Sequence, residues 1–261
     1  MEPIDRIIVS ANEHPFYLPF WPVVVAAWKK FFDVEVHLAF VTCRDKQDPL
    51  VVRLEKYGNV HIYRPMQDVP EPNFSKIARY LLASRFPGDI CTIADIDSVP
   101  LQRNYLVQIA GMRHPGTLLT LGGDAYKGTS EDGKWPAGWM TAEGALFGWM
   151  FSDLEPYRRV RFFDCKEALE NSPDVFSDES LLRYVVKQKR IPTFHVERAF
   201  KPKEAFIDRS WWCIDEKRLA VGNYIECNFK RPGGEHWMDI KPIVEYITGR
   251  PTHREEALIE W

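Results

Sequence analysis

The chain has few cysteines for its 261 residues, and none of them form a Cys-x-x-Cys pair. An odd number of widely separated cysteines excludes a disulfide framework and a zinc knuckle, and it favours a reducing compartment. The five are Cys43, Cys91, Cys165, Cys213 and Cys227.

A long apolar run is also missing. The most apolar stretch near the N-terminus, Pro15 to Trp28, is broken by two prolines and is shorter than the roughly 20 residues of a membrane span. The acidic residues Glu2, Asp5 and Glu13 precede it, whereas a signal peptide begins with basic residues. We therefore expect a cytoplasmic protein with no membrane span.

Excess charge of one sign is absent as well. The chain carries 34 basic and 37 acidic residues, a net charge of −3, without the basic excess of nucleic-acid-binding domains. A hydrophobic content of 45% excludes disorder, and no repeat or linker divides the chain. We expect a single domain over residues 1–261 and no nucleic-acid partner; the sequence does not indicate an oligomeric state.

Aromatic residues, in contrast, are plentiful, with nine Trp, ten Tyr and sixteen Phe. Most aromatic side chains serve as core material, but they also line clefts for flat or ring-shaped ligands.

The first hundred residues alternate between short apolar strands and amphipathic helices, which is typical of a parallel sheet covered by helices on both faces. The expected strands are residues 6–11, 35–42, 59–63 and 89–94, and the expected helices are 17–32, 48–56 and 74–84.

After residue 100 the pattern is less regular. We expect helices at 101–110 and 178–189, strands at 117–121 and 143–151, and a long glycine-rich loop at 122–138. Short strands and a terminal helical pair follow residue 210. The predicted fold class is α/β, with a Rossmann-like, mostly parallel central sheet, helices on both faces and an irregular C-terminal half.

The sharpest motif is Asp95-Ile-Asp97, at the end of the fourth predicted strand. Ligands bind at the carboxyl ends of the strands in open α/β sheets, and paired carboxylates there suit Mg²⁺ or Mn²⁺. The motif therefore predicts a metal site at Asp95 and Asp97 that would bridge nucleotide phosphates. Alternatively, Asp97 or Ser98 could cap a helix that starts near Leu101.

A helix carrying Lys76 and Arg79, followed by Ile93-Ala-Asp95-Ile-Asp97-Ser-Val-Pro100, resembles the nucleotide-sugar-dependent glycosyltransferases of the GT-A fold. Small viral and bacterial members without a membrane anchor are nearest in style. The resemblance implies a GT-A-like domain in which Asp95 and Asp97 hold Mn²⁺ or Mg²⁺ against the diphosphate of a sugar nucleotide. It covers residues 6–100, the expected nucleotide-binding half, and leaves 101–261 as the acceptor-binding half.

The resemblance implies further site residues. Ser10, Ala11 and Asn12, at the end of the first strand, would meet the base and ribose, although Ser and Asn are also common turn formers. Asp178 and Glu179, at the start of a helix, would face the reacting sugar, or they could simply favour the helix dipole there.

Near the C-terminus, His236 and Lys241-Pro242 are similar to a family element in which the histidine completes the metal site and the lysine contacts the diphosphate. Here the spacing is one residue shorter and a glycine is missing. A structural role for His236 is the alternative.

Sugar contacts are expected around the glycine-rich loop. Trp135, Trp139 and Trp237 could stack on sugar rings, and Glu143 with Gly144 could receive sugar hydroxyls. The neighbouring Trp149 is expected to be a core strand residue instead.

Together these features predict a metal-dependent glycosyltransferase of the hexosyl type. The donor would be a nucleoside diphosphate sugar with UDP as the expected nucleotide, and the acceptor a hydroxyl of a glycan, glycoprotein or glycolipid. Lys76, Arg79 or Lys241 would add positive charge at the diphosphate. The alternatives are a nucleotidyltransferase that makes a sugar nucleotide and a non-catalytic carbohydrate-binding module.

Overall fold

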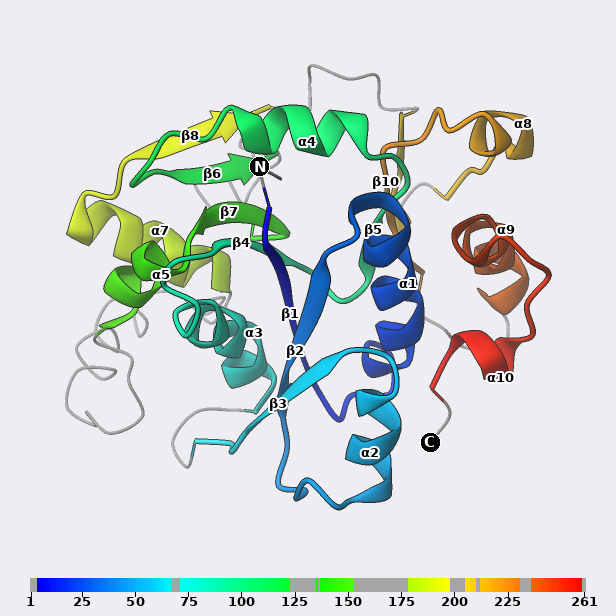
Figure 1. Cartoon of the computed structure of the whole chain (residues 1–261), viewed down its shortest axis with the longest axis horizontal. Helices are drawn as coiled ribbons and strands as arrows, with labels where there is room; N and C mark the ends of the chain where they lie inside the picture. The colour runs from blue at the N-terminus through cyan, green and yellow to red at the C-terminus, as the bar shows by residue number, and fades with distance from the viewer. Residues whose placement is uncertain are drawn as a thin grey trace.

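The computed structural model describes residues 4–66, 71–122, 135, 137–152, 178–197, 205–209, 212–230 and 236–259. At its centre lies a seven-stranded sheet with the strand order β3-β2-β1-β4-β7-β6-β8 (Figure 1). The strands are β1 (Arg6–Asn12), β2 (Glu35–Val41), β3 (Asn59–Tyr63), β4 (Ile90–Ala94), β6 (Leu118–Leu121), β7 (Trp139–Glu143) and β8 (Thr193–Val196).

The sheet is mostly parallel. Strand β1 pairs in parallel with β2 and β4, and β2 pairs in parallel with β3. Strand β7 runs antiparallel between β4 and β6, and β6 pairs in parallel with β8. As a result, the carboxyl ends of β1, β2 and β4 share one edge of the sheet with the beginning of β7. We call this the carboxyl edge and the opposite one the amino edge.

Helices cover both faces of the sheet (Figure 1). Side chains alternate along each strand, so Ile7 and Val9 lie in one hydrophobic core and Ile8 lies in the other. The α1-side core includes side chains of α1 (Trp21–Phe32), α2 (Pro49–Glu55), α4 (Asn104–Gly111) and α9 (Trp237–Thr248). The α3-side core includes side chains of α3 (Glu71–Ala83), α5 (Gly144–Met150) and α7 (Asp178–Lys189).

A second, three-stranded sheet adjoins the carboxyl edge. It has the order β5-β10-β9, with β10 antiparallel to β5 and parallel to β9. Its strands are β5 (Ser98–Pro100), β9 (Phe206–Ile207) and β10 (Glu226–Asn228). The remaining described elements are a single 3-10 turn (Leu18–Phe20), α8 (Glu216–Ala220) and α10 (Arg254–Ala257).

Local sequence signals explain several helix ends. The Asp48 side chain accepts a hydrogen bond from the Leu50 N–H and caps α2, whose first residue is Pro49. Helix α1 is terminated by the residue after it, Asp33, which adopts a left-handed conformation with φ 52°.

The structure confirms the predicted fold class and the strand–helix alternation of the first hundred residues. It also confirms the terminal helical pair and the helix at 178–189. Most of the expected loop at 122–138 lies outside the described residues.

The predicted strand at 143–151 is wrong. Strand β7 ends at Glu143, and residues 144–150 form α5, which buries Leu146, Phe147 and Met150 on one helical face. Trp149 is half exposed, not part of a core strand. The alternation of large and small residues in this short segment fits both periods, and tertiary packing decides for the helix.

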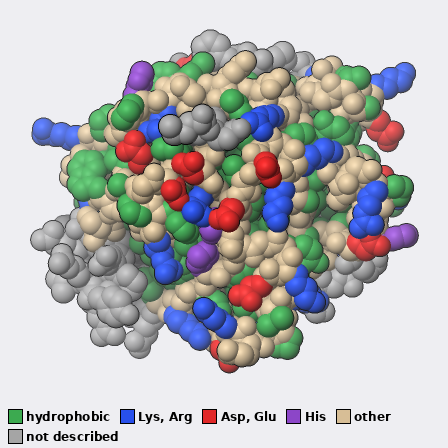
Figure 2. Space-filling view, viewed as in Figure 1, with side chains coloured by type: hydrophobic (Ala, Val, Ile, Leu, Met, Phe, Trp, Pro, Cys, Tyr) green, Lys and Arg blue, Asp and Glu red, His purple; other side chains and the backbone are tan. Residues whose placement is uncertain are grey.

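In the part of the chain that the structure describes, no helix is both long and apolar enough to cross a membrane. On the face seen in Figure 2, acidic and basic side chains are interspersed, in keeping with the small net charge.

Candidate functional site

Asp95 and Asp97 lie at the carboxyl edge, on the turn that leads from β4 into β5. The Ser98 N–H donates to the Asp95 carbonyl over 3.1 Å, and the Phe229 N–H donates to the Asp97 carbonyl over 2.7 Å. The second bond ties the turn to the end of β10. The helix-cap alternative is wrong, because residues 98–100 form a strand and the residue preceding α4 is Arg103.

The two carboxylates differ in exposure, and each is paired with an arginine. The Asp95 side chain is 44% exposed, and its Oδ1 accepts from Arg79 Nη1 at 2.6 Å. The Asp97 side chain is only 10% exposed, and its Oδ2 accepts from Arg209 Nη1 at 2.7 Å. The pairings bring two basic groups, from α3 and from the segment after β9, to the two acidic groups of one turn.

Burial disfavours the charge on Asp97. Burial and the neighbouring Asp95 carboxylate raise the pKa of Asp97 above its ordinary value, while Arg209 and Arg79 oppose this rise. In return, Asp97 raises the pKa of Arg209. Asp97 therefore holds its negative charge less easily than an exposed aspartate does.

A chain of buried hydrogen bonds supports the residue that follows Asp97. The Ser98 hydroxyl donates to Glu226 Oε1 at 3.1 Å and accepts from Trp139 Nε1 at 3.3 Å. Trp139 is 5% exposed and packs against Trp28 in the α1-side core. Its expected role as a sugar-stacking residue is therefore corrected: its indole is enclosed by the core and holds the Asp97 turn.

Gly138 lies directly against the other carboxylate. A Cβ at Gly138 would come within 3.1 Å of Asp95 Oδ2, so any larger residue would push the carboxylate aside. The glycine just before β7 thus leaves room for the Asp95 carboxylate.

The donor set at this turn fits a divalent cation of the Mg²⁺ or Mn²⁺ type. Both carboxylates come from one turn, both are hard oxygen donors, and one is buried beside the other. Among the described residues, no three His, Cys, Asp or Glu side chains are grouped so that they could hold a metal ion. Phosphate and water oxygens would have to fill the other positions, as is usual for Mg²⁺.

His236 is not grouped with these carboxylates. Its Nδ1 lies 3.5 Å from Asp239 Oδ2 at the start of α9, and Lys241 pairs with Glu245 along the same helix at 3.7 Å. Their expected roles at the metal and the diphosphate stay predictions.

The predicted nucleotide-binding residues Ser10, Ala11 and Asn12 are the last three of β1, at the same edge as Asp95. Ala11 is buried, whereas Ser10 and Asn12 are partly exposed. The next residue, Glu13, accepts from the Thr42 hydroxyl and, at 2.9 Å, from Arg44 Nε.

Helix α3 delivers Arg79 to the site but leaves Lys76 on its exposed side. The Arg79 residue is 4% exposed, and its Nη1 also donates to the Ala94 carbonyl at 3.3 Å. Arg79 is therefore fixed both to the end of β4 and to Asp95.

Glu143 and Gly144 lie at the wrong edge for the expected sugar contacts. Because β7 is antiparallel to β4, Trp139 pairs with Ala94 at the carboxyl edge, whereas Glu143 pairs with Ile90 at the amino edge. Glu143 instead binds Arg113 at 3.1 Å. The prediction that these two residues receive the hydroxyls of a sugar bound at Asp95 is corrected accordingly.

The remaining predicted residues are placed as follows. Trp135 is partly buried, with its ring edge-on to His195 at 4.5 Å between ring centres, and Trp237 packs against the α1-side core. Asp178 and Glu179 begin α7, as expected, and Glu179 is partly exposed. The Asp178 side chain lies outside what the structure describes.

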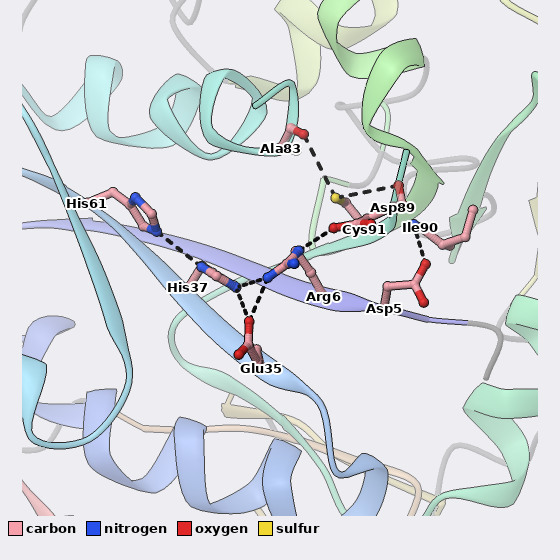
Figure 3. A network of polar contacts seen from close by, with 9 residues as sticks. All are labelled: Asp5, Arg6, Glu35, His37, His61, Ala83, Asp89, Ile90 and Cys91. Carbon is pink, nitrogen blue, oxygen red and sulfur yellow. Dashed lines mark hydrogen bonds and ion pairs between the residues drawn. The ribbon is translucent and has the colours of Figure 1, made fainter. Parts of the chain in front are cut away.

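A separate polar cluster lies at the amino edge, near the starts of β1, β2 and β4 (Figure 3). Arg6 binds Glu35 at 2.6 Å, contacts Asp89 and donates to His37 Nε2 at 3.0 Å. His37 Nδ1 lies 3.1 Å from His61 Nε2. Burial, together with His61 and Arg6, lowers the pKa of His37 to about 4. This cluster is remote from Asp95 and ties four strands together.

Sequence reasoning missed Arg209 and Glu226. Both lie more than a hundred residues from the Asp95 motif and come next to it only through the short strands β9 and β10. Strands of two and three residues leave no periodic signal that could have located them.

Comparison with solved structures supports the fold. No protein-family model matches the chain, and no curated protein matches it. Among solved structures, it is similar to the glycosyltransferase GlyE of Streptococcus pneumoniae TIGR4, with a TM-score of 0.54 and 10% identity. The apo form of the same enzyme gives a TM-score of 0.55, also at 10% identity. Each match covers 97% of this chain and 62% of that one, so the chain spans less than two thirds of the length of these neighbours. The chain therefore shares its fold with these glycosyltransferases.

Proposed function

We propose that the chain is a glycosyltransferase that moves a sugar from a nucleoside diphosphate sugar to a hydroxyl acceptor. The observation that carries the proposal is the Asp95–Asp97 pair at the carboxyl edge, flanked by Arg79 and Arg209. This is where α/β sheets bind nucleotides, and the fold resembles that of a glycosyltransferase.

Mn²⁺ or Mg²⁺ is the proposed cofactor, held by Asp95 and Asp97. When bound, such a cation supplies Lewis-acid stabilisation for the negative charge that develops on a leaving diphosphate. The chain's own contribution is to keep both carboxylates in place, through Arg79 on one side and the Ser98–Glu226 bond on the other.

The proposed division of labour follows the two halves of the chain. In the first half, residues 6–100, the end of β1 at Ser10 to Asn12 would receive the base and ribose of the donor, with UDP as the first nucleotide to test. In the second half, residues 101–261, the acceptor glycan, glycoprotein or glycolipid would bind, with Trp135 and Trp237 as stacking residues.

The start of α7 is proposed to serve the reacting sugar. Asp178 or Glu179 would take the proton from the acceptor hydroxyl if the reaction inverts the anomeric centre, and would steady the positively charged sugar if it retains it. The N-terminus of a helix favours the charged form of such a carboxylate.

A thermal-shift panel tests this function. UDP, GDP, CDP and ADP, and nucleotide-sugars of each, are added with and without Mn²⁺, and the melting temperature is recorded. Ligands that bind the native state raise its stability. A rise in melting temperature with the nucleotides of one base, seen only when Mn²⁺ is present, therefore supports the proposal. Stabilisation by free sugars that is indifferent to Mn²⁺ and nucleotide would point to a binding module instead.

A further inference from the structure

We infer that Arg209 is an exchangeable counter-ion of Asp97. In the free protein it pairs with the Asp97 carboxylate. When the divalent cation binds Asp97, Arg209 leaves the carboxylate and binds the donor's diphosphate. The inference rests on the proposed function and adds to it a donor-binding residue that the sequence did not indicate. It is carried by the placement of Arg209, its exposure and the charge balance of the site.

The small sheet fixes where Arg209 lies. Cys227 of β10 pairs with Val99 of β5 on one side and with Ile207 of β9 on the other. Arg209 follows β9 by two residues, and Asp97 precedes β5 by one. The pairing of these strands thus brings the guanidinium, from the segment after β9, to Asp97 Oδ2 at 2.7 Å.

The two arginines at the site differ in how firmly they are held. Arg79 is buried and is bonded to a backbone carbonyl as well as to Asp95. The Arg209 side chain is 54% exposed, and the Asp97 bond is the hydrogen bond that the structure gives it. The Arg209 side chain can therefore turn towards solvent, whereas Arg79 is enclosed and held at two points. Because Asp97 is buried, its charge needs a partner, so Arg209 leaves at small cost only when a cation takes its place.

Charge balance supports an exchange. In the free protein each of the two carboxylates is matched in formal charge by its guanidinium. A divalent cation and the doubly charged diphosphate of a sugar nucleotide also cancel each other, so their joint arrival leaves the net charge of the site unchanged. Either one alone would change it, and partly buried charge is costly.

The released guanidinium has a suitable new partner. Its planar array of N–H donors binds phosphate oxygens in a bidentate way that a lysine cannot reproduce. The cation would take the place of Arg209 at Asp97, so a diphosphate bound to that cation would lie within reach of Arg209.

The test compares Arg209→Ala and Arg209→Lys with wild type and with Arg250→Ala. Arg250 is a matched control, an exposed arginine paired with Glu256 at 3.2 Å beyond the end of α9. Binding of Mn²⁺ without nucleotide is measured from the electron paramagnetic resonance signal of the free ion. Binding of UDP at saturating Mn²⁺ is measured by calorimetry.

Opposite shifts are expected in Arg209→Ala. Without its competitor, Mn²⁺ should bind about two- to fivefold more tightly. UDP should bind roughly tenfold more weakly or worse, because a charge-assisted hydrogen bond to phosphate is lost. Arg209→Lys should keep the wild-type Mn²⁺ affinity and still bind UDP more weakly, and Arg250→Ala should match wild type in both measurements.

A merely structural role for Arg209 would weaken Mn²⁺ and UDP binding together, and that result would overturn the inference. Unchanged affinities in Arg209→Ala would overturn it too, while leaving the proposed function standing. If wild type binds neither Mn²⁺ nor a nucleoside diphosphate, the proposed function and the inference fail together.

Discussion

Among the glycines that the structure describes, Gly144 is the one at which an added Cβ would come closest to a neighbouring atom. A Cβ there would lie 2.1 Å from the Phe86 carbonyl oxygen and 2.6 Å from that of Ala83. These contacts are with backbone atoms, which cannot turn aside as a flexible side chain can. Gly144 is therefore a packing residue at the junction of α3 and α5.

We predict that Gly144→Ala lowers the free energy of unfolding by about 3 kcal/mol, the upper end of the range typical of overpacking. Gly148→Ala, four residues along the same helix, is the control, because its Cβ would meet only Ser84 Cβ at an ordinary 3.5 Å. There the gain in helix propensity should be neutral or add about 0.5–1 kcal/mol. Urea unfolding of both variants measures the difference; equal stabilities would contradict the close approach.

At the scale of elements, the candidate site depends on how β5 and β10 pair. Ser98 lies between the Trp139 indole and the Glu226 carboxylate, and both of these partners are buried. The hydroxyl is therefore the link between β7, the Asp97 turn and the small sheet.

We predict that Ser98→Ala lowers the free energy of unfolding by about 1–3 kcal/mol, because two buried polar groups lose a hydrogen-bond partner. It should also weaken Mn²⁺ binding, since the preceding residue is Asp97. Ser84→Ala removes a local bond to the Leu81 carbonyl at a partly exposed position and should change stability by only a few tenths of a kcal/mol. Denaturant unfolding and Mn²⁺ titration of both variants test the link, and a Ser98→Ala protein with wild-type stability would refute it.

At the scale of the whole molecule, the amino-edge cluster makes stability depend on pH. The folded protein lowers the pKa of His37 from 6.5 to about 4, mainly through burial, and lowers that of His61 as well. Below about pH 6.5 these histidines become protonated in the unfolded chain before they do in the folded chain. Stability is therefore full above that pH and is lost as the pH falls towards 4.

We predict that His37 alone accounts for as much as about 3 kcal/mol of this loss, at about 1.36 kcal/mol per pH unit. His37→Gln keeps a group that can accept from Arg6 but does not titrate, so its stability should fall less between pH 6.5 and 4. His253→Gln, at an exposed histidine before α10, should keep the wild-type profile. Unfolding free energies measured across this range decide the matter, and parallel profiles for wild type and His37→Gln would contradict the prediction.

The architecture was largely predictable from the sequence because its parallel half repeats one pattern. Apolar runs such as Arg6–Ala11 and Asn59–Tyr63 read as strands, and Asp48-Pro49 marks a helix start. The Asp95–Asp97 motif was found because it follows such a strand, whose end marks the ligand-binding edge.

The rest depends on information that local patterns do not hold. The direction of β7 decides that Trp139 lies near Asp95 and Glu143 does not, and no residue pattern encodes that direction. Arg209 and Glu226 reach the motif through pairings between distant strand fragments, so only the tertiary structure reveals them.

The central claim, that Asp95 and Asp97 form the cation site of a sugar-nucleotide enzyme, is tested most directly by donor hydrolysis. Wild type and Asp97→Asn are incubated without acceptor with a set of UDP-sugars, in Mn²⁺ or in EDTA, and the release of UDP is followed. Wild type should release UDP only with Mn²⁺, and Asp97→Asn at least about a hundredfold more slowly. The variant should melt no lower than wild type, because burial disfavours the charge it removes. Equal release by both proteins, or release by wild type that EDTA leaves unchanged, would contradict the claim.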